Sequence, residues 1–137
     1  MSVAARKIAT ILRCVERARA EYAQAGDAFK QDFTRQDAAV LNVTRACEAA
    51  IDLASMIIRK QKLGVPAEAR ESFALLERGG LIPPELSTRM QRMVGFRNVA
   101  VHQYQDLDLN IVEAVIRTGL NELLTFAEAV RPYLKDS

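Results

Sequence analysis

The sequence predicts an all-α fold, an up-and-down bundle of four main helices and one short helix. Apolar residues recur at three- and four-residue spacing along nearly the whole chain, and no segment shows the alternating pattern of a β-strand. The connections between the apolar stretches are short, as in antiparallel bundles. With 137 residues, 50% of them apolar, we expect a single domain over residues 1–137 that buries its own core.

The first two helices are predicted from long apolar stripes. One helix is expected over about residues 3 to 24. The second begins near Thr34, where Asp37 three residues on forms a weak capping box, and Gly64 and Pro66 stop it. The stripe residues are Ile8, Ile11, Leu12, Val15, Ala18 and Tyr22 in the first helix and Val40, Leu41, Thr44, Cys47, Ile51, Ala54 and Ile58 in the second.

Glycine and proline separate the remaining helices. A short helix lies between Ala67 and Arg78 and ends at a glycine pair, residues 79–80, and the next helix starts at a proline pair, residues 83–84. The last helix runs from about Leu109 to Lys135, with Asp108 as its N-cap. The expected inward residues are Phe73, Leu75, Leu76, Leu86, Met90, Met93, Val94, Val101, Ile111, Val115, Leu120, Leu123, Leu124, Ala127, Val130 and Leu134.

Composition limits the possible partners and the location of the chain. The net charge of +2 is too small to attract nucleic acid through the whole molecule, so an RNA partner would have to contact a local patch. No apolar run approaches the roughly 20 residues that cross a bilayer, and the N-terminus lacks the apolar core of a secretion signal. We therefore expect no membrane association and a cytoplasmic location. Cys14 and Cys47 are expected to be small core residues.

A polar cluster in apolar surroundings is the candidate site. The segment RNVAVHQY, residues 97–104, holds the one histidine of the chain, His102, five residues after Arg97. Arginine is a permanent planar cation that binds phosphate oxygens in pairs, and histidine exchanges protons near neutral pH. Asn98 and Tyr104 add polar groups within reach. The combination indicates phosphate chemistry.

Helix geometry restricts how these residues can meet. Asn98 and His102 share a helix face, whereas Arg97 and His102 diverge by roughly 140°. Arg97 and His102 can act on one ligand if the helix ends near the histidine, which the polar run 103–110 favours, or if they line opposite walls of a cleft. A structural interpretation stays open, with the histidine as a helix cap, the arginine on the surface, and Tyr104 and Asn98 in local contacts.

Acidic residues in the second helix could support the site. Glu48 and Asp52 lie four residues apart beside Arg45 and could orient a catalytic arginine, although such residues more commonly form ion pairs on a bundle surface, the interpretation that we favour here. One histidine without a convergent carboxylate cluster is a poor transition-metal ligand set. The sequence therefore predicts no metal site and no cofactor.

The segment from Met93 to Tyr104 resembles the signature of HEPN-domain proteins: an arginine, a polar residue, and a histidine after a short gap. It is most similar to the HepT toxins of HepT/MntA toxin–antitoxin pairs, in which the histidine is followed by any residue and then tyrosine. Arg97, Asn98, His102 and Tyr104 occupy these positions. The resemblance implies a HEPN-like bundle and a metal-independent endoribonuclease toxin.

Metal-free RNA cleavage requires a base for the 2′-hydroxyl, a cation for the phosphate and an acid for the leaving 5′-oxygen. One chain offers a single histidine, and a two-fold homodimer would bring two His102 and two Arg97 to one cleft. The resemblance implies the same arrangement. We expect His102 to act as general base or acid, Arg97 to hold the phosphate and Asn98 to orient the site.

The resemblance also implies a modification site and a partner. Tyr104 is expected at the mouth of the cleft with its hydroxyl pointing outward, as the acceptor of AMP from an MntA-type nucleotidyltransferase antitoxin. The added AMP would block the cationic pocket. Two alternatives remain, a binding module that holds a nucleotide or RNA without cutting it, and a purely structural helical partner of a nucleotidyltransferase.

Overall fold

Six α-helices account for most of the chain in the computed structural model, which describes residues 2–135. No strand occurs within these residues, and the all-α prediction is confirmed. The helices are α1 (Val3–Ala25), α2 (Phe33–Gln61), α3 (Ala69–Arg78), α4 (Pro84–His102), α5 (Leu109–Ala114) and α6 (Leu120–Val130). Shorter turns are η1 (Gly26–Gln31), η2 (Tyr104–Asp106), the π-helical η3 (Val115–Gly119) and η4 (Arg131–Leu134).

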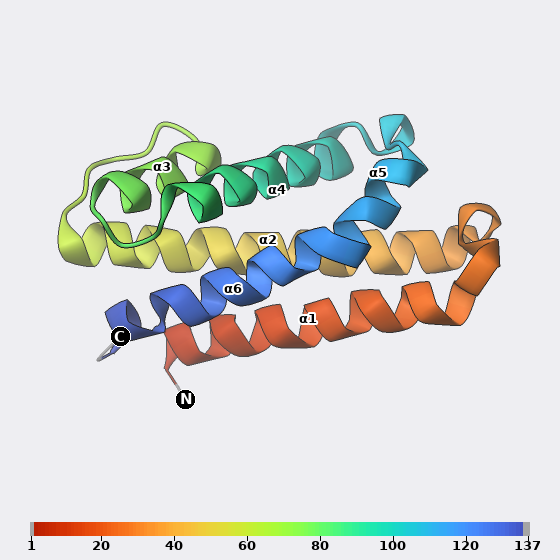
Figure 1. Cartoon of the computed structure of the whole chain (residues 1–137), viewed down its shortest axis with the longest axis horizontal. Helices are drawn as coiled ribbons and strands as arrows, with labels where there is room; N and C mark the ends of the chain where they lie inside the picture. Colours follow the sequence, from red (N-terminus) through yellow and green to blue (C-terminus); the bar gives the residue numbers. More distant parts are fainter. Residues whose placement is uncertain (1, 136–137) are drawn as a thin grey trace.

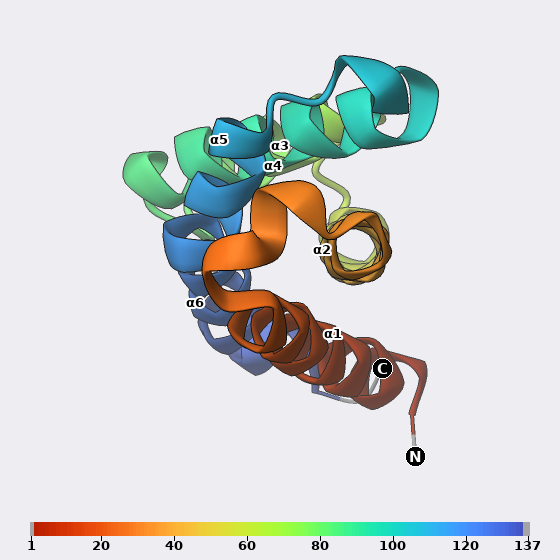
Figure 2. The same cartoon turned by 90° about the vertical axis from the view of Figure 1, so that its right-hand side faces the viewer.

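Helix α2 is the central element of the bundle. It lies between α1 on one side and α3 and α4 on the other, and α6 packs along α1 (Figure 1). The view along the bundle in Figure 2 shows α4, α2 and α1 stacked in the same order. The first and last helices meet at one end of the molecule, whereas α4 ends toward the opposite end (Figure 1). The candidate site is therefore far from the two chain ends.

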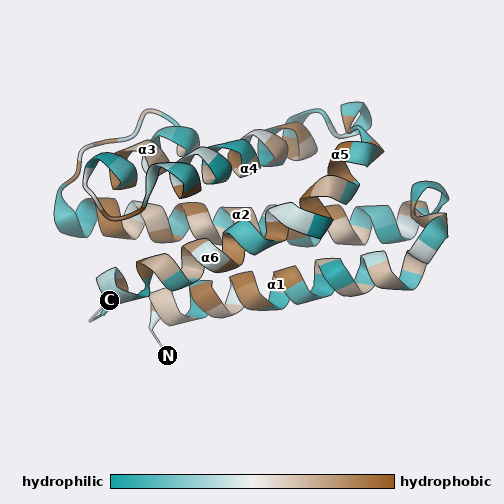
Figure 3. Cartoon of the chain, in the orientation of Figure 1, coloured by the Kyte–Doolittle hydropathy of each residue, from teal (hydrophilic) through white to brown (hydrophobic). Residues whose placement is uncertain are grey.

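The apolar stripes of the helices meet in one continuous core. Figure 3 shows the apolar residues on the inward faces of α1, α2 and α6 and polar residues on the outer faces. Phe29, Phe73 and Phe126 are fully buried, and the rings of Phe73 and Phe126 meet edge to face with centroids 5.2 Å apart. Cys14 and Cys47 are buried free thiols, as predicted.

Helix ends match the sequence at several points and differ at others. Pro84 occupies the first turn of α4, and the Asp108 carboxylate caps α5 by accepting a hydrogen bond from the Asn110 amide. The predicted capping box at Thr34 is wrong, because the η1 turn places the side chain of Asp32 to accept from the Arg35 amide at 3.0 Å. Helix α2 also ends before Gly64, since Lys62 adopts the left-handed conformation with φ of 55°.

Four residues expected in the core are exposed: Leu12, Leu41, Val101 and Ile111. For Ile111 the reason is the π-helical turn η3, which interrupts the last helix where the sequence predicted regular α-helix. The extra residue in a π turn shifts the helix face by about 100°, so the apolar stripe of α6 cannot be extended back into α5. Leu41 and Val101 lie on a shared face described below.

No helix within residues 2–135 is long and apolar enough to cross a membrane.

Candidate active site

The candidate motif occupies the last turns of α4 and the η2 turn. Helix α4 ends at His102, as predicted, and the Gln103 amide closes it by donating to the Val99 carbonyl at 2.8 Å. Gln103 then leaves the helical conformation, with φ of −142°. The helix end allows Tyr104 to turn back toward α2 instead of continuing around α4.

Arg97 points from α4 toward α2, where it meets Glu48. Its Nη1 atom lies 3.3 Å from Glu48 Oε1, and 17% of the Arg97 side chain is exposed. The Arg97 Nε atom is buried and has no hydrogen-bond partner in the described structure. A guanidinium held on one edge by a carboxylate can still present its other nitrogen to an anion. Arg97 is thus positioned by α2 without being fully neutralised by a bidentate pair.

Cys47, a buried residue close to this ion pair, is unreactive. Burial raises the pKa of the Cys47 thiol to about 12, a shift to which the negative charge of Glu48 adds and which the positive charge of Arg97 opposes. The Sγ atom lies 3.9 Å from the Met93 carbonyl oxygen. A neutral buried thiol is a poor nucleophile, so Cys47 packs α2 against α4 and takes no part in chemistry.

Tyr104 forms the second contact between this segment and α2. Its hydroxyl donates a hydrogen bond to Asp37 Oδ1, although the residue is 42% exposed. The hydroxyl thus contacts an exposed carboxylate on α2, because η2 turns the ring toward that helix. Partial burial raises the pKa of Tyr104 to about 12, and the hydrogen bond and the negative charge of Asp37 act in the same direction. The role of Asp37 was missed because it is 67 positions away in sequence and carries no local signal.

His102 and Asn98 are not joined to Arg97 within one chain. His102 is exposed, Asn98 is half-buried, and no hydrogen bond or ion pair connects the three side chains among residues 2–135. Helix geometry explains the separation, because Arg97 faces α2 while His102 lies roughly 140° around the axis. One chain therefore presents the residue types for phosphate chemistry without closing a site around them.

Apolar residues surround these polar contacts on the face shared by α2 and α4. Leu41 lies one turn from Asp37 on α2 and is 48% exposed, and Val101 lies one turn from Arg97 on α4 and is 49% exposed. Phe33, one turn before Asp37, is also exposed. We call this set, with Tyr104, the α2–α4 face. Exposed large apolar side chains gathered beside polar groups are typical of interfaces.

The two acidic residues singled out in α2 have different partners. Glu48 contacts the candidate arginine, whereas Asp52 accepts a hydrogen bond from Lys7 on α1 at 2.7 Å. They lie four residues apart in one helix, yet Glu48 faces α4 and Asp52 faces α1. The orienting interpretation thus fits Glu48, and the surface ion-pair interpretation fits Asp52.

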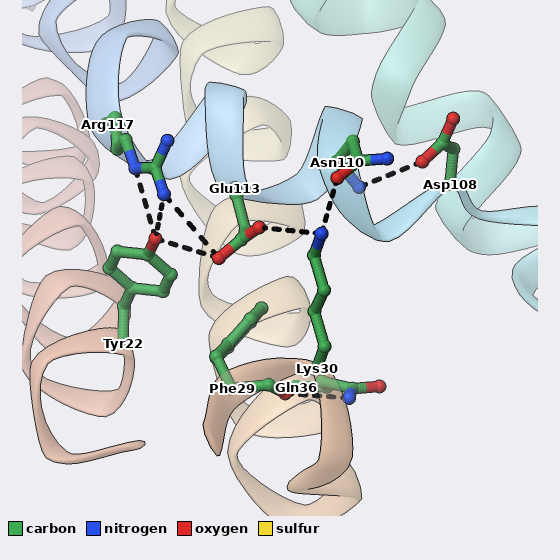
Figure 4. Close-up of polar contacts among 8 residues, drawn as sticks. All are labelled: Tyr22, Phe29, Lys30, Gln36, Asp108, Asn110, Glu113 and Arg117. Atoms are coloured by element: carbon green, nitrogen blue, oxygen red, sulfur yellow. Dashed lines mark hydrogen bonds and ion pairs between the residues drawn. The ribbon is translucent and has the colours of Figure 1, made fainter. Parts of the chain in front are cut away.

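A polar network fixes the helix that follows the motif (Figure 4). The Lys30 ammonium of η1 donates to Asn110 Oδ1 at 2.6 Å and lies 3.7 Å from Glu113 Oε1. Tyr22 of α1 donates to Glu113 Oε2 at 2.9 Å, and Arg117 donates to the Tyr22 oxygen at 2.7 Å. These contacts tie α5 to α1 and η1, so the loop from Gln103 to Asp108 runs between two anchored helices.

A groove lies on another part of α4. It has a volume of about 700 Å³ between α4 and the α5–η3 segment, with an apolar floor that includes Met93, Phe96, Val99 and Leu107. Arg97, His102 and Tyr104 are not among the residues that line this groove. The polar side chains of the motif therefore lie outside this groove, although Val99 of the same segment lines it. Within residues 2–135, His, Cys, Asp and Glu side chains form no group of three or more placed to hold a metal ion.

Known proteins are similar to this chain over most of its length. The family model described as "Ribonuclease HepT-like" matches residues 11–130. The chain is 47% identical to the mRNA nuclease HepT of Shewanella oneidensis over 91% of its own length and 93% of that protein. It is 32% identical to the tRNA nuclease HepT of Aphanizomenon flos-aquae over 64% of its own length and 59% of that protein.

A solved structure has the same fold. The tri-AMPylated HEPN toxin of Shewanella oneidensis, in complex with an MNT antitoxin, superimposes with a TM-score of 0.90 at 44% identity. The match covers 96% of this chain and 98% of that one. The order and packing of the helices are therefore those of a known toxin that carries AMP.

Proposed function

Because this chain belongs to the HepT-like ribonuclease family, we propose that it is the toxin of a toxin–antitoxin pair, an endoribonuclease that cuts RNA without a metal ion. The observation that carries the proposal is the placement of Arg97, half-buried and held by Glu48, on the last turns of α4, the helix that ends at an exposed His102. Relatives that act on mRNA and on tRNA share this family. The proposed substrate class is therefore RNA, with the choice of RNA set by features outside the motif.

The proposed reaction is attack of a ribose 2′-hydroxyl on the adjacent phosphorus. One His102 takes the hydroxyl proton as the bond from O2′ to phosphorus forms, and an acid protonates the 5′-oxygen as its bond to phosphorus breaks. The Arg97 guanidinium stabilises the extra negative charge on the phosphate oxygens. Asn98, half-buried on the same helix face as His102, orients the imidazole or the substrate.

A two-fold homodimer supplies what one chain lacks. The α2–α4 face carries exposed Leu41 and Val101 directly beside the polar contacts of Asp37 and Glu48, which favours it as the dimer interface. An isologous pairing through this face brings both copies of His102 to one cleft, one as base and the other as acid. The same pairing buries the exposed side chains of Leu41 and Val101.

Tyr104 is the proposed acceptor of AMP from an MNT-type nucleotidyltransferase antitoxin. Of the three tyrosines in the chain, Tyr104 is the most exposed. Tyr22 is half-buried, with Glu113 and Arg117 on its hydroxyl, and Tyr133 packs against the core. A transferred AMP just after His102, at the end of α4, would place a negative phosphodiester and a bulky nucleoside in the RNA path. We further propose that the pair acts in the cytoplasm.

RNA cleavage by the purified protein in the presence of a chelator tests this function. Wild type is expected to cut RNA at an undiminished rate, and His102→Ala to be inactive. Strict dependence on added magnesium, or full activity of His102→Ala, would contradict the proposed chemistry. An inactive protein that binds RNA tightly would instead indicate a non-catalytic binding module.

A further inference from the structure

The hydroxyl of Tyr104 is already held by a carboxylate of its own chain. Asp37, on the first turns of α2, accepts the hydrogen bond that Tyr104 donates from η2. Asp37 and Tyr104 are both exposed residues. A phenol hydrogen-bonded to a solvent-accessible carboxylate is the arrangement in which a proton can pass from nucleophile to base.

We propose that Asp37 is the general base for adenylylation of Tyr104, so that the toxin supplies part of the catalytic machinery for its own neutralisation. The inference rests on the proposed function, in which an antitoxin nucleotidyltransferase delivers ATP. The Tyr104 oxygen forms a bond to the α-phosphorus while the bond from that phosphorus to the oxygen bridging to the β-phosphorus breaks. Pyrophosphate leaves with the electron pair, and the phenolic proton passes to the Asp37 carboxylate.

The need for a local base follows from the acidity of Tyr104. Its pKa is raised to about 12 by partial burial first and then by the hydrogen bond and charge of Asp37. At neutral pH the free phenolate is then roughly one part in 10⁵, too rare to act as a preformed nucleophile. The proton must therefore leave during attack, when charge moves from the phenol to the phosphate. Asp37 is in contact with that proton before the nucleotide arrives.

A second tyrosine in the chain provides an internal contrast. Tyr22 also donates to a carboxylate, that of Glu113, but its oxygen additionally accepts hydrogen bonds from Arg117 at 2.7 and 3.1 Å (Figure 4). Those bonds occupy the lone pairs that would have to attack phosphorus. Asp37 is the one hydrogen-bond partner recorded for the Tyr104 hydroxyl within residues 2–135, and its oxygen keeps a lone pair available.

A purely structural role for the Asp37 contact makes a different prediction from catalysis. If Asp37 merely anchors the ring, Asn at position 37 can still accept the same hydrogen bond and the transfer rate should hardly change. If Asp37 takes the proton, Asn cannot replace it, because an amide oxygen is not basic. Glu can restore part of the rate, since it is a carboxylate on a longer side chain.

The experiment measures AMP transfer to the full-length chain by the purified MNT antitoxin of Shewanella oneidensis with ATP. Intact-mass spectrometry follows the first addition over time at several antitoxin concentrations. The variants are Asp37→Asn, Asp37→Glu and, as a control with the same charge change, Asp27→Asn on the exposed η1 turn. Circular dichroism and a melting curve check that each variant is folded.

We expect the maximal rate of Asp37→Asn to fall about 100-fold or more, the usual contribution of a general base. The half-saturating antitoxin concentration should stay unchanged, Asp37→Glu should recover part of the rate, and Asp27→Asn should match wild type. A maximal rate of Asp37→Asn close to wild type would overturn the role of Asp37 while leaving the proposed function intact. A wild-type chain that takes no AMP would overturn the proposed neutralisation, and this inference with it.

Discussion

Replacing Glu48 with glutamine tests whether α2 positions the candidate phosphate-binding arginine. The substitution preserves the shape of the side chain and removes its charge, so that Arg97 loses an ion pair of 3.3 Å. At that separation two unit charges interact by about 1.3 kcal/mol in water and about 5 kcal/mol at the dielectric of a protein surface. About half of the Glu48 side chain is exposed, so the lower figure applies.

An orienting contribution of about 1 kcal/mol corresponds to a roughly fivefold effect on rate. We expect Glu48→Gln to lower kcat for RNA cleavage by about that factor, with KM unchanged or lower, because removing a negative charge near Arg97 favours the anionic substrate. The free energy of unfolding should change by less than about 1 kcal/mol, as for other exposed ion pairs. Single-turnover cleavage kinetics and urea denaturation measure the two quantities.

Asp52→Asn is the matched control, since it removes the same charge one turn further along α2, where the carboxylate pairs with Lys7 at 2.7 Å. It should leave kcat unchanged. A Glu48→Gln variant that cleaves RNA as fast as wild type or faster would refute the positioning role. Equal losses in both variants would show that the effect comes from net charge and not from Arg97.

Four further predictions follow from the site. Arg97→Ala, Arg97→Lys and His102→Ala should each reduce cleavage at least about 100-fold without lowering the melting temperature by more than a few degrees, because lysine lacks the planar fork and alanine cannot transfer a proton. Tyr104→Phe should keep much of its nuclease activity but gain no AMP on co-expression with the antitoxin; an AMP-bearing Tyr104→Phe would move the acceptor elsewhere. Phenolate absorbance should give Tyr104 a pKa of about 12, and Asp37→Asn should shift that pKa toward 10.0. The raised pKa favours the neutral phenol in the folded state. Its contribution to the free energy of unfolding is therefore complete below pH 10.0 and is lost as the pH rises through about 12. Leu41→Asp should give a monomer by light scattering that no longer cleaves RNA, and an active monomer would argue against the two-chain site.

Local patterns in the sequence were sufficient to predict the helices and the position at which α4 ends. Pro84 fixes the first turn of that helix, and the polar residues after His102 end it, so the motif was expected at a helix terminus and is found there. Such features depend on a few consecutive residues. Comparison with known proteins confirms the family and the fold that the motif implied.

Contacts between distant residues could not be predicted from the sequence. Glu48 and Asp52 carry the same charge four residues apart, and the packing of α2 between α4 and α1 decides which of them meets Arg97. The spacing of Asp37 after Thr34 predicts a helix cap, whereas the η2 turn brings Tyr104 to Asp37 across 67 positions. The π-helical turn η3 is likewise set by tertiary packing, since the residues around it have ordinary helical spacing.

The most direct test of the two-chain site is the RNA cleavage rate of mixed dimers. Wild-type and His102→Ala chains are co-expressed in equal amounts, so that they pair at random. The cleavage rate of this mixture is compared with that of pure wild-type protein at the same total chain concentration. If one cleft needs both copies of His102, activity should fall to about one quarter, since one dimer in four then retains two histidines. A fall to one half would show that each chain cleaves RNA independently, and would contradict the composite site.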